Sequence, residues 1–133
     1  MGFVEVPLGA AQEAEAVPEG EYDLRVAKFD ETTSKAGNAM YKAIIIIESK
    51  YHPNPQPIVE YFTLPNGKDD EHANMKMLNI KRFLAVFNVP FEESGFNDED
   101  VPGALGKCHV VNDTYEPDDG EPREQNKLRL PPL

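Results

Sequence analysis

Alternating apolar and polar residues predict short β-strands along much of this chain. In residues 21–30, one face of the predicted strand carries Tyr22, Leu24 and Val26. The opposite face carries Arg25, Ala27 and Phe29. Successive side chains of a strand point to opposite sides, so these two sets are expected on opposite faces of a sheet.

A second strand is predicted over residues 40–49, where the apolar run indicates that both faces are at least partly covered. One side carries Tyr41, Ala43, Ile45 and Ile47, and the other carries Met40, Lys42, Ile44 and Ile46. A third strand is predicted over residues 58–64. There Tyr61 and Phe62 must point opposite ways, so one of them belongs to the core. The alternation leaves open which one it is.

After a turn at residues 65–68 and acidic residues at 69–71, apolar side chains recur at helical spacing up to Asn88. They are Ala73, Met77, Ile80, Phe83, Leu84 and Phe87. Two more strands are predicted over residues 107–113 and 125–130, separated by an acidic, proline-containing loop around residues 116–122. Three strands, one helix and two strands are the order of a five-stranded OB-fold, a partly open Greek-key barrel. We expect residues 1–17 to form an N-terminal arm and residues 18–133 the OB-fold domain.

Composition narrows the class of protein. A chain of 133 residues fits one domain, and it has no apolar run long enough for a membrane span. Its N-terminus lacks the features of a signal peptide, and Cys108 has no second cysteine with which to form an intrachain disulfide. We therefore expect a soluble protein of the cytoplasm.

The net charge of −11 is unevenly distributed. Residues 21–88 balance nine acids against nine bases, whereas the segments before and after them are acidic. Acidic ends keep a protein soluble, and they are also compatible with a locally basic surface that binds a ligand. The charge pattern therefore does not exclude nucleic acid as a ligand.

Three motifs follow one another along the chain: VPEGEY at residues 17–22, TSKAGNAM at 33–40 and LGK at 105–107. With this ordered set the chain resembles the short OB-fold single-stranded-DNA-binding proteins of bacteriophage replication and recombination modules. The resemblance implies action in the host-cell cytoplasm, on single-stranded DNA and beside phage or host replication and recombination proteins. The acidic loop at residues 116–124 departs from the compact glycine-containing turn of those proteins, which puts that loop's contact with DNA in doubt.

Binding of a single strand needs cations along the backbone path and flat side chains on which bases stack. Seven residues are candidates for this nucleic-acid-binding site: Arg25, Phe29, Lys35, Asn38, Lys42, Tyr51 and Tyr61. An alternative for Arg25 and Lys42 is that they pair with acidic residues on neighbouring strands. If Tyr41, Ala43, Ile45 and Ile47 fill the barrel, Ile44 and Ile46 need cover, for which a second subunit in a homo-oligomer such as a homodimer is one source.

The sequence gives little support to an enzymatic function. Cys108 and His109 are adjacent in a predicted strand, so they point to opposite faces and cannot form a nucleophile–base pair. We expect no catalytic residues, no metal site and no cofactor. The alternative to DNA binding is an acidic protein-interaction module, an OB-fold adaptor or DNA mimic that binds a replication or recombination partner. A magnesium-dependent nuclease is a third and weaker hypothesis.

Overall fold

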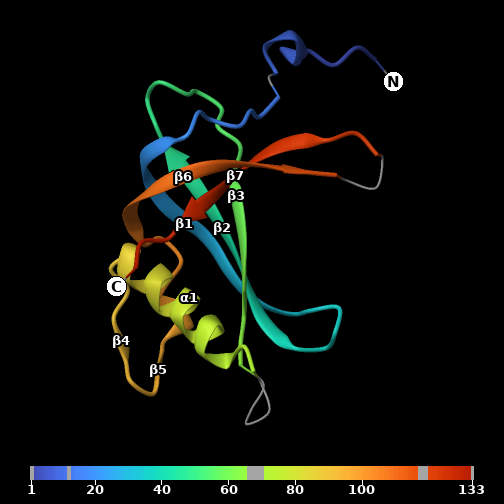
Figure 1. The fold of residues 1–133 in the computed structure, drawn as a ribbon. Coiled ribbons are helices and arrows are strands. Elements are labelled where there is room, and N and C mark those ends of the chain that lie inside the picture. The colour runs from blue at the N-terminus through green and yellow to red at the C-terminus, as the bar shows by residue number, and fades with distance from the viewer. Residues whose placement is uncertain (1, 12, 66–70, 117–119, 133) are drawn as a thin grey trace.

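The computed structural model describes residues 2–11, 13–65, 71–116 and 120–132, and strands account for 44% of the chain. Five antiparallel strands form one sheet in the order β3-β2-β1-β6-β7 (Figure 1). These strands are β1 (Gly20–Thr33), β2 (Ala39–Glu48), β3 (Ile58–Thr63), β6 (Leu105–Tyr115) and β7 (Arg123–Arg129). The other elements are η1 (Leu8–Ala10), α1 (Ala73–Val86), β4 (Phe91–Glu92), β5 (Gly95–Phe96) and η2 (Asp98–Asp100).

The predicted order of three strands, a helix and two strands is confirmed. The sequence pattern missed the β4–β5 hairpin, because strands of two residues are too short to show an alternation. Most of the predicted turn at 65–68, the acidic residues 69 and 70, and the loop centre at 117–119 lie outside the described residues.

A β-bulge in β1 changes which side chains face the core. The register between β1 and β2 shifts between Val26 and Lys28, so the residue between them, Ala27, is extra. A bulge reverses the alternation that follows it. Phe29 therefore turns inward and is only 8% exposed, while Lys28 is exposed. The prediction that Phe29 shares a face with Arg25 is wrong, because it assumed an unbroken period of two.

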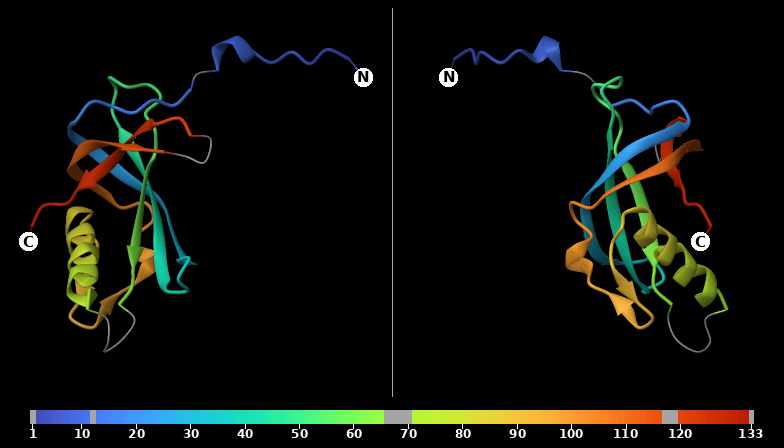
Figure 2. Two further views of the ribbon diagram at one scale, coloured as in Figure 1. Left: turned by 45° about the vertical axis from the view of Figure 1, so that its right-hand side comes forward. Right: turned by 90° about the vertical axis from the view of Figure 1, so that its left-hand side faces the viewer.

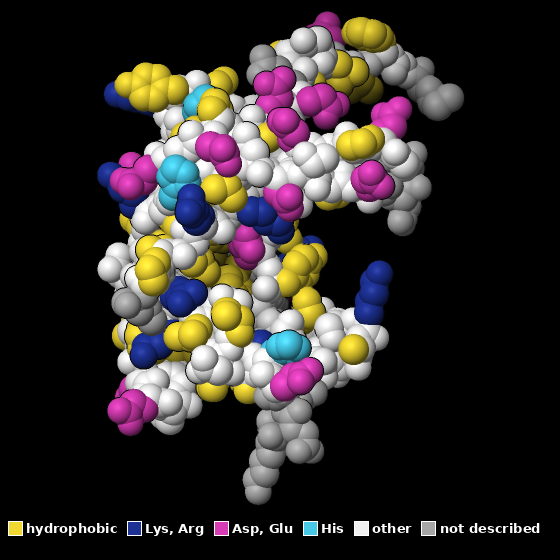
Figure 3. All heavy atoms as spheres, viewed as in Figure 1, with side chains coloured by type: hydrophobic (Ala, Val, Ile, Leu, Met, Phe, Trp, Pro, Cys, Tyr) yellow, Lys and Arg dark blue, Asp and Glu magenta, His cyan; other side chains and the backbone are white. Residues whose placement is uncertain are grey.

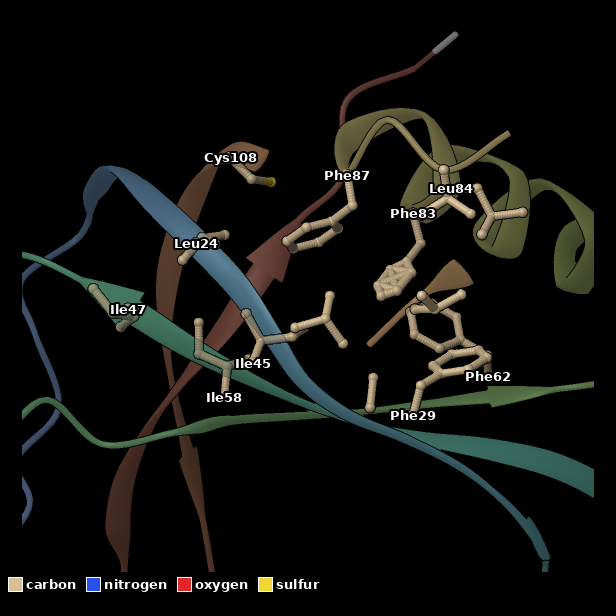
Figure 4. Packing of buried hydrophobic residues seen from close by; sticks show 14 of the residues in the cluster. Leu24, Phe29, Ile45, Ile47, Ile58, Phe62, Phe83, Leu84, Phe87 and Cys108 are labelled. Carbon is tan, nitrogen blue, oxygen red and sulfur yellow. The ribbon is translucent and has the colours of Figure 1, made fainter. Parts of the chain in front are cut away.

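Helix α1 packs its C-terminal half against the inner face of the sheet (Figure 4). The Phe83 ring lies 4.6 Å from that of Phe62 and 4.9 Å from that of Phe87, measured between ring centroids. The predicted helical stripe is confirmed at Phe83, Leu84 and Phe87, which are buried, whereas Met77 is 52% exposed. On β2 the side that carries Ala43, Ile45 and Ile47 is buried, so it is the inner face.

The chain before β1 is tied to the sheet by a buried asparagine. The Val17 amide donates to Asn126 Oδ1 at 2.8 Å, and Asn126 Nδ2 donates to the Val17 carbonyl at 3.0 Å. Both residues are at most 2% exposed, so these bonds satisfy backbone groups that water does not reach. The preceding segment, residues 2–11, projects away from the sheet at the end opposite α1 (Figure 2).

Gly106 permits a close approach between β6 and the end of α1. A Cβ at this position would overlap the backbone carbonyl of Val86 and lie 3.1 Å from Phe87 Cδ1. Because backbone cannot move aside as a flexible side chain can, only glycine fits here without a shift of the helix. The LGK motif thus has a packing role.

Replacing Gly106 with alanine is expected to lower the free energy of unfolding by about 1–3 kcal/mol through this overlap. Urea denaturation monitored by circular dichroism measures the change. The control is Gly20→Ala, also in a strand, where the nearest atom would be Tyr22 Cε2 at 3.8 Å, an ordinary contact. Equal stability of the two variants would contradict the packing role.

Candidate nucleic-acid interface

Tyr61 and Lys42 lie side by side on the outer face of the sheet. They are paired in the β2–β3 register, and the neighbour of Lys42 on β1 is Asp30. Tyr61 is 52% exposed and Phe62 only 6%, which answers the question that the alternation left open. Directly paired side chains have Cβ atoms about 5 Å apart, so an aromatic ring and an ammonium group share one patch of surface.

Lys28 is the residue of this face that the sequence pattern missed. The bulge turns it outward, opposite Ile44, which in turn pairs with Val59 on β3. Lys42 is two residues from Ile44 on β2, so Lys28 and Lys42 are diagonal neighbours, about 7–8 Å apart at their backbones. A signal was present in the sequence. A lysine in the apolar phase of β1, followed by a phenylalanine in the polar phase, indicates a bulge.

The loop between β1 and β2 presents Lys35 on a closed backbone. The Ser34 amide donates to the Asn38 carbonyl at 2.8 Å, and the Asn38 amide donates to Ser34 Oγ at 3.0 Å. Gly37 has φ = +87°, a conformation that glycine adopts without strain. Asn38 thus closes the loop through its backbone, and Lys35 is exposed at the turn.

Two of the predicted residues lie farther away, Arg25 on β1 and Tyr51 beyond the end of β2. Arg25 Nε is 2.7 Å from Glu48 Oε1, so the cross-strand pairing considered for this arginine is what the structure contains. Tyr51 is 78% exposed but follows the far end of β2. Since ten strand residues span about 30 Å, the structure does not bring Tyr51 together with Lys35.

Phe29 does not face the outer surface. Its ring stacks on that of Tyr41 at a centroid distance of 4.4 Å, inside the core. The Tyr41 hydroxyl donates to Asp98 Oδ2 at 2.8 Å, and burial, followed by this bond, raises the pKa of Tyr41 to about 12. Phe29 therefore belongs to the packing beneath the face, and bases cannot stack on it.

The two edge strands of the sheet, β3 and β7, contact each other through side chains, and we call this contact the β3–β7 seam. Lys127 Nζ donates to the Val59 carbonyl at 2.6 Å, and the Leu128 amide donates to Glu60 Oε1 at 3.1 Å. Among the described residues, no backbone ladder joins these two strands, so the sheet curls without closing into a barrel. Burial raises the pKa of the Glu60 carboxyl. The hydrogen bond from the Leu128 amide and the charge of Lys127 act to lower this pKa, but burial has the larger effect.

Acidic side chains gather at one end of the molecule. In Figure 3 they lie over the N-terminal segment and the β6–β7 hairpin, and the surface is hollowed between this hairpin and the β1–β2 hairpin below it. Exposed members include Glu13, Glu15, Asp113, Glu121 and Glu124. The face with Lys28, Lys42 and Tyr61 is thus bordered by negative charge on the side of β6 and β7.

Within the described residues, no group of three or more His, Cys, Asp and Glu side chains is placed to hold a metal ion. Cys108 is buried and His109 is exposed, which confirms that they point to opposite faces, and burial raises the pKa of the Cys108 thiol. Within the same ranges, no helix has the length and apolar character needed to cross a membrane.

Comparison with known proteins adds no family assignment. A scan against models of protein families finds none that matches this chain. A search of curated proteins likewise finds no match.

Because the pKa of Glu60 is raised in the folded state, its protonated form stabilises the fold. This contribution to the free energy of unfolding is present below the unfolded pKa and is lost as pH rises through the folded pKa. Glu60→Gln removes this loss and keeps an acceptor for the Leu128 amide. We expect the variant to gain stability relative to the wild type as pH rises above about 4.5, the unperturbed value. Urea unfolding at several pH values measures the difference.

The matched control is Glu124→Gln, which removes one negative charge from the exposed part of β7. If the difference in free energy of unfolding between Glu60→Gln and the wild type is constant across the pH series, the pKa of the Glu60 carboxyl is not raised by its place in the β3–β7 seam.

Proposed function

We propose that this protein binds single-stranded DNA without catalysis, through the outer face of β1, β2 and β3. One observation carries the proposal: Lys42 lies directly beside the exposed ring of Tyr61, with Lys28 as its diagonal neighbour. Cations that follow the phosphates and a flat ring that stacks on a base are the two elements of sequence-tolerant binding of single strands. The Lys35 loop extends the same face.

We propose further that the sheet is an OB-fold related to the phage proteins that the sequence resembles. The strand order, the helix between β3 and β6, and the side-chain contacts between β3 and β7 support this assignment. OB-folds bind oligonucleotides on the surface of their second and third strands and on the loop that precedes the second. Here these are β2, β3 and residues 34–38.

The charges set the expected strength of binding. Three lysines, Lys28, Lys35 and Lys42, lie on the proposed path of the DNA strand. They are expected to give a salt slope, the slope of the logarithm of the binding constant against the logarithm of salt concentration, of about −2, at roughly 0.7 per phosphate neutralised on a single strand. The acidic β6–β7 hairpin repels phosphate, so the strand is expected to leave the face before reaching it. Arg25 contributes little, because Glu48 already neutralises it.

The double variant Lys28→Ala/Lys42→Ala tests the path. Titration of a fluorescent oligo-dT at several low salt concentrations is expected to show weaker binding and a salt slope smaller by about 1.4, because two phosphate contacts are lost. Lys81→Ala/Arg129→Ala is the control with the same change in net charge, made on α1 and at the end of β7. Equal losses in both variants would mean that only total charge matters.

Tyr61 tests the stacking part of the site. Tyr61→Ala is expected to cost about 1–3 kcal/mol of binding free energy, whereas Tyr61→Phe keeps the ring and most of the affinity. The same titration measures both, and the salt slope should not change. If alanine and phenylalanine behave alike, no base stacks on this residue.

The acidic hairpin and N-terminal segment favour one alternative, an interaction module that presents negative charge to a replication or recombination protein. Its distinguishing result is no binding of oligo-dT up to about 100 µM, the weak end of non-specific binding, together with recovery of a protein partner after nuclease treatment. A magnesium-dependent cleavage assay with the same oligonucleotide tests the nuclease hypothesis.

A further inference from the structure

A carboxylate lies in the middle of the proposed binding face. Asp30 on β1 is the direct neighbour of Lys42 on β2, and Lys42 is in turn the direct neighbour of Tyr61 on β3. These three side chains form a row across the outer face, because directly paired residues point to the same side of a sheet. Asp30 and Tyr61, at the two ends of the row, are both exposed.

Asp30 differs from two other acids of the same face. Asp23 Oδ1 lies 3.7 Å from Lys107 Nζ, and Glu48 Oε1 lies 2.7 Å from Arg25 Nε, so each of these carboxylates has a basic partner. Within the part of the chain that the structure describes, no ion pair joins Asp30 to either of its neighbouring lysines. Its carboxylate is therefore available as a hydrogen-bond acceptor beside the proposed path of the phosphates.

A carboxylate in this position restricts what can bind next to it. It repels phosphate and only accepts hydrogen bonds, so the ligand must supply N–H or O–H donors. Deoxyribose within a strand has no hydroxyl, so the donors of single-stranded DNA are on the bases. Guanine alone has two adjacent donors on its Watson–Crick edge, N1–H and the 2-amino group, which match the two oxygens of a carboxylate. Thymine has one donor between two acceptors, which a carboxylate repels.

We propose that Asp30 binds the Watson–Crick edge of guanine and gives the face a preference for strands that contain this base. The inference rests on the proposed function, because it needs a base stacked on Tyr61. β1 and β3 are two strand spacings apart, about 10 Å, which a purine and the Asp30 side chain cover together. Lys42, between them, is half-buried, so its aliphatic part lies along the sheet beneath the base and its ammonium group contacts a phosphate.

Titration of three fluorescent oligonucleotides of about 12 nucleotides tests this preference. The first has thymine throughout, the second has one guanine near its centre, and the third has inosine in place of that guanine. The wild type is expected to bind the second at least about fivefold more tightly than the first, through the two hydrogen bonds. Inosine keeps the purine ring but lacks the 2-amino group, so most of this gain should be lost if it comes from hydrogen bonds and not from stacking.

Asp30→Asn is expected to abolish the preference, because its amide nitrogen is a donor that faces the donors of guanine. It should bind the all-thymine strand no more weakly than the wild type does, since a negative charge beside the phosphates is removed. Glu31→Gln is the control with the same change in net charge. Glu31 is paired with Tyr41 and is the next residue of β1, so it points to the opposite side and its variant should keep the preference.

The outcomes separate this inference from the proposed function. Equal affinity of the wild type for the thymine and guanine strands, or a preference that survives in Asp30→Asn, would overturn the role of Asp30 and leave DNA binding in place. An equal loss of preference in Asp30→Asn and Glu31→Gln would also overturn it. Failure of the wild type to bind any of the three oligonucleotides would reject the proposed function, and the inference with it.

Discussion

The β-bulge in β1 is the constraint on which the rest of this structure depends. β1 pairs with β2 along most of its length and with β6 only up to Arg25. Beyond that point the Val26 amide donates to the Ala104 carbonyl at 2.9 Å, and the Gly103 amide donates to the Val26 carbonyl at 2.7 Å. A bulge bends its strand and increases the local twist. One extra residue therefore curls the sheet and turns Phe29 inward under helix α1.

The same bulge produces the proposed binding face. It moves Lys28 outward, beside the pair of Lys42 and Tyr61, while Phe29 fills the core beneath them. The open edge at β3 is held by bonds from Lys127 and Leu128 of β7. Unpaired strand edges are prone to unwanted pairing, and side-chain bonds across this seam reduce that risk while keeping β3 in place.

One predicted contact between copies of this chain involves the outer face of the sheet. Ile44 and Ile46 are half-buried on the outer face, among the residues proposed to contact DNA. Cover of these isoleucines by a second subunit stays a prediction, and it would compete with a bound strand.

The sequence by itself determined the order of strands and helix, which side chains of β2 share a side, and the position of the Lys35 loop. These features follow from local periodicity and turn-forming residues, which are present in each segment regardless of the segments it packs against. Tertiary structure decided the rest. Whether Tyr61 or Phe62 faces outward depends on which side the helix covers, and the fates of Phe29 and Lys28 depend on a register shift against β2. Such choices are made by pairing and burial between distant segments, which no local pattern contains.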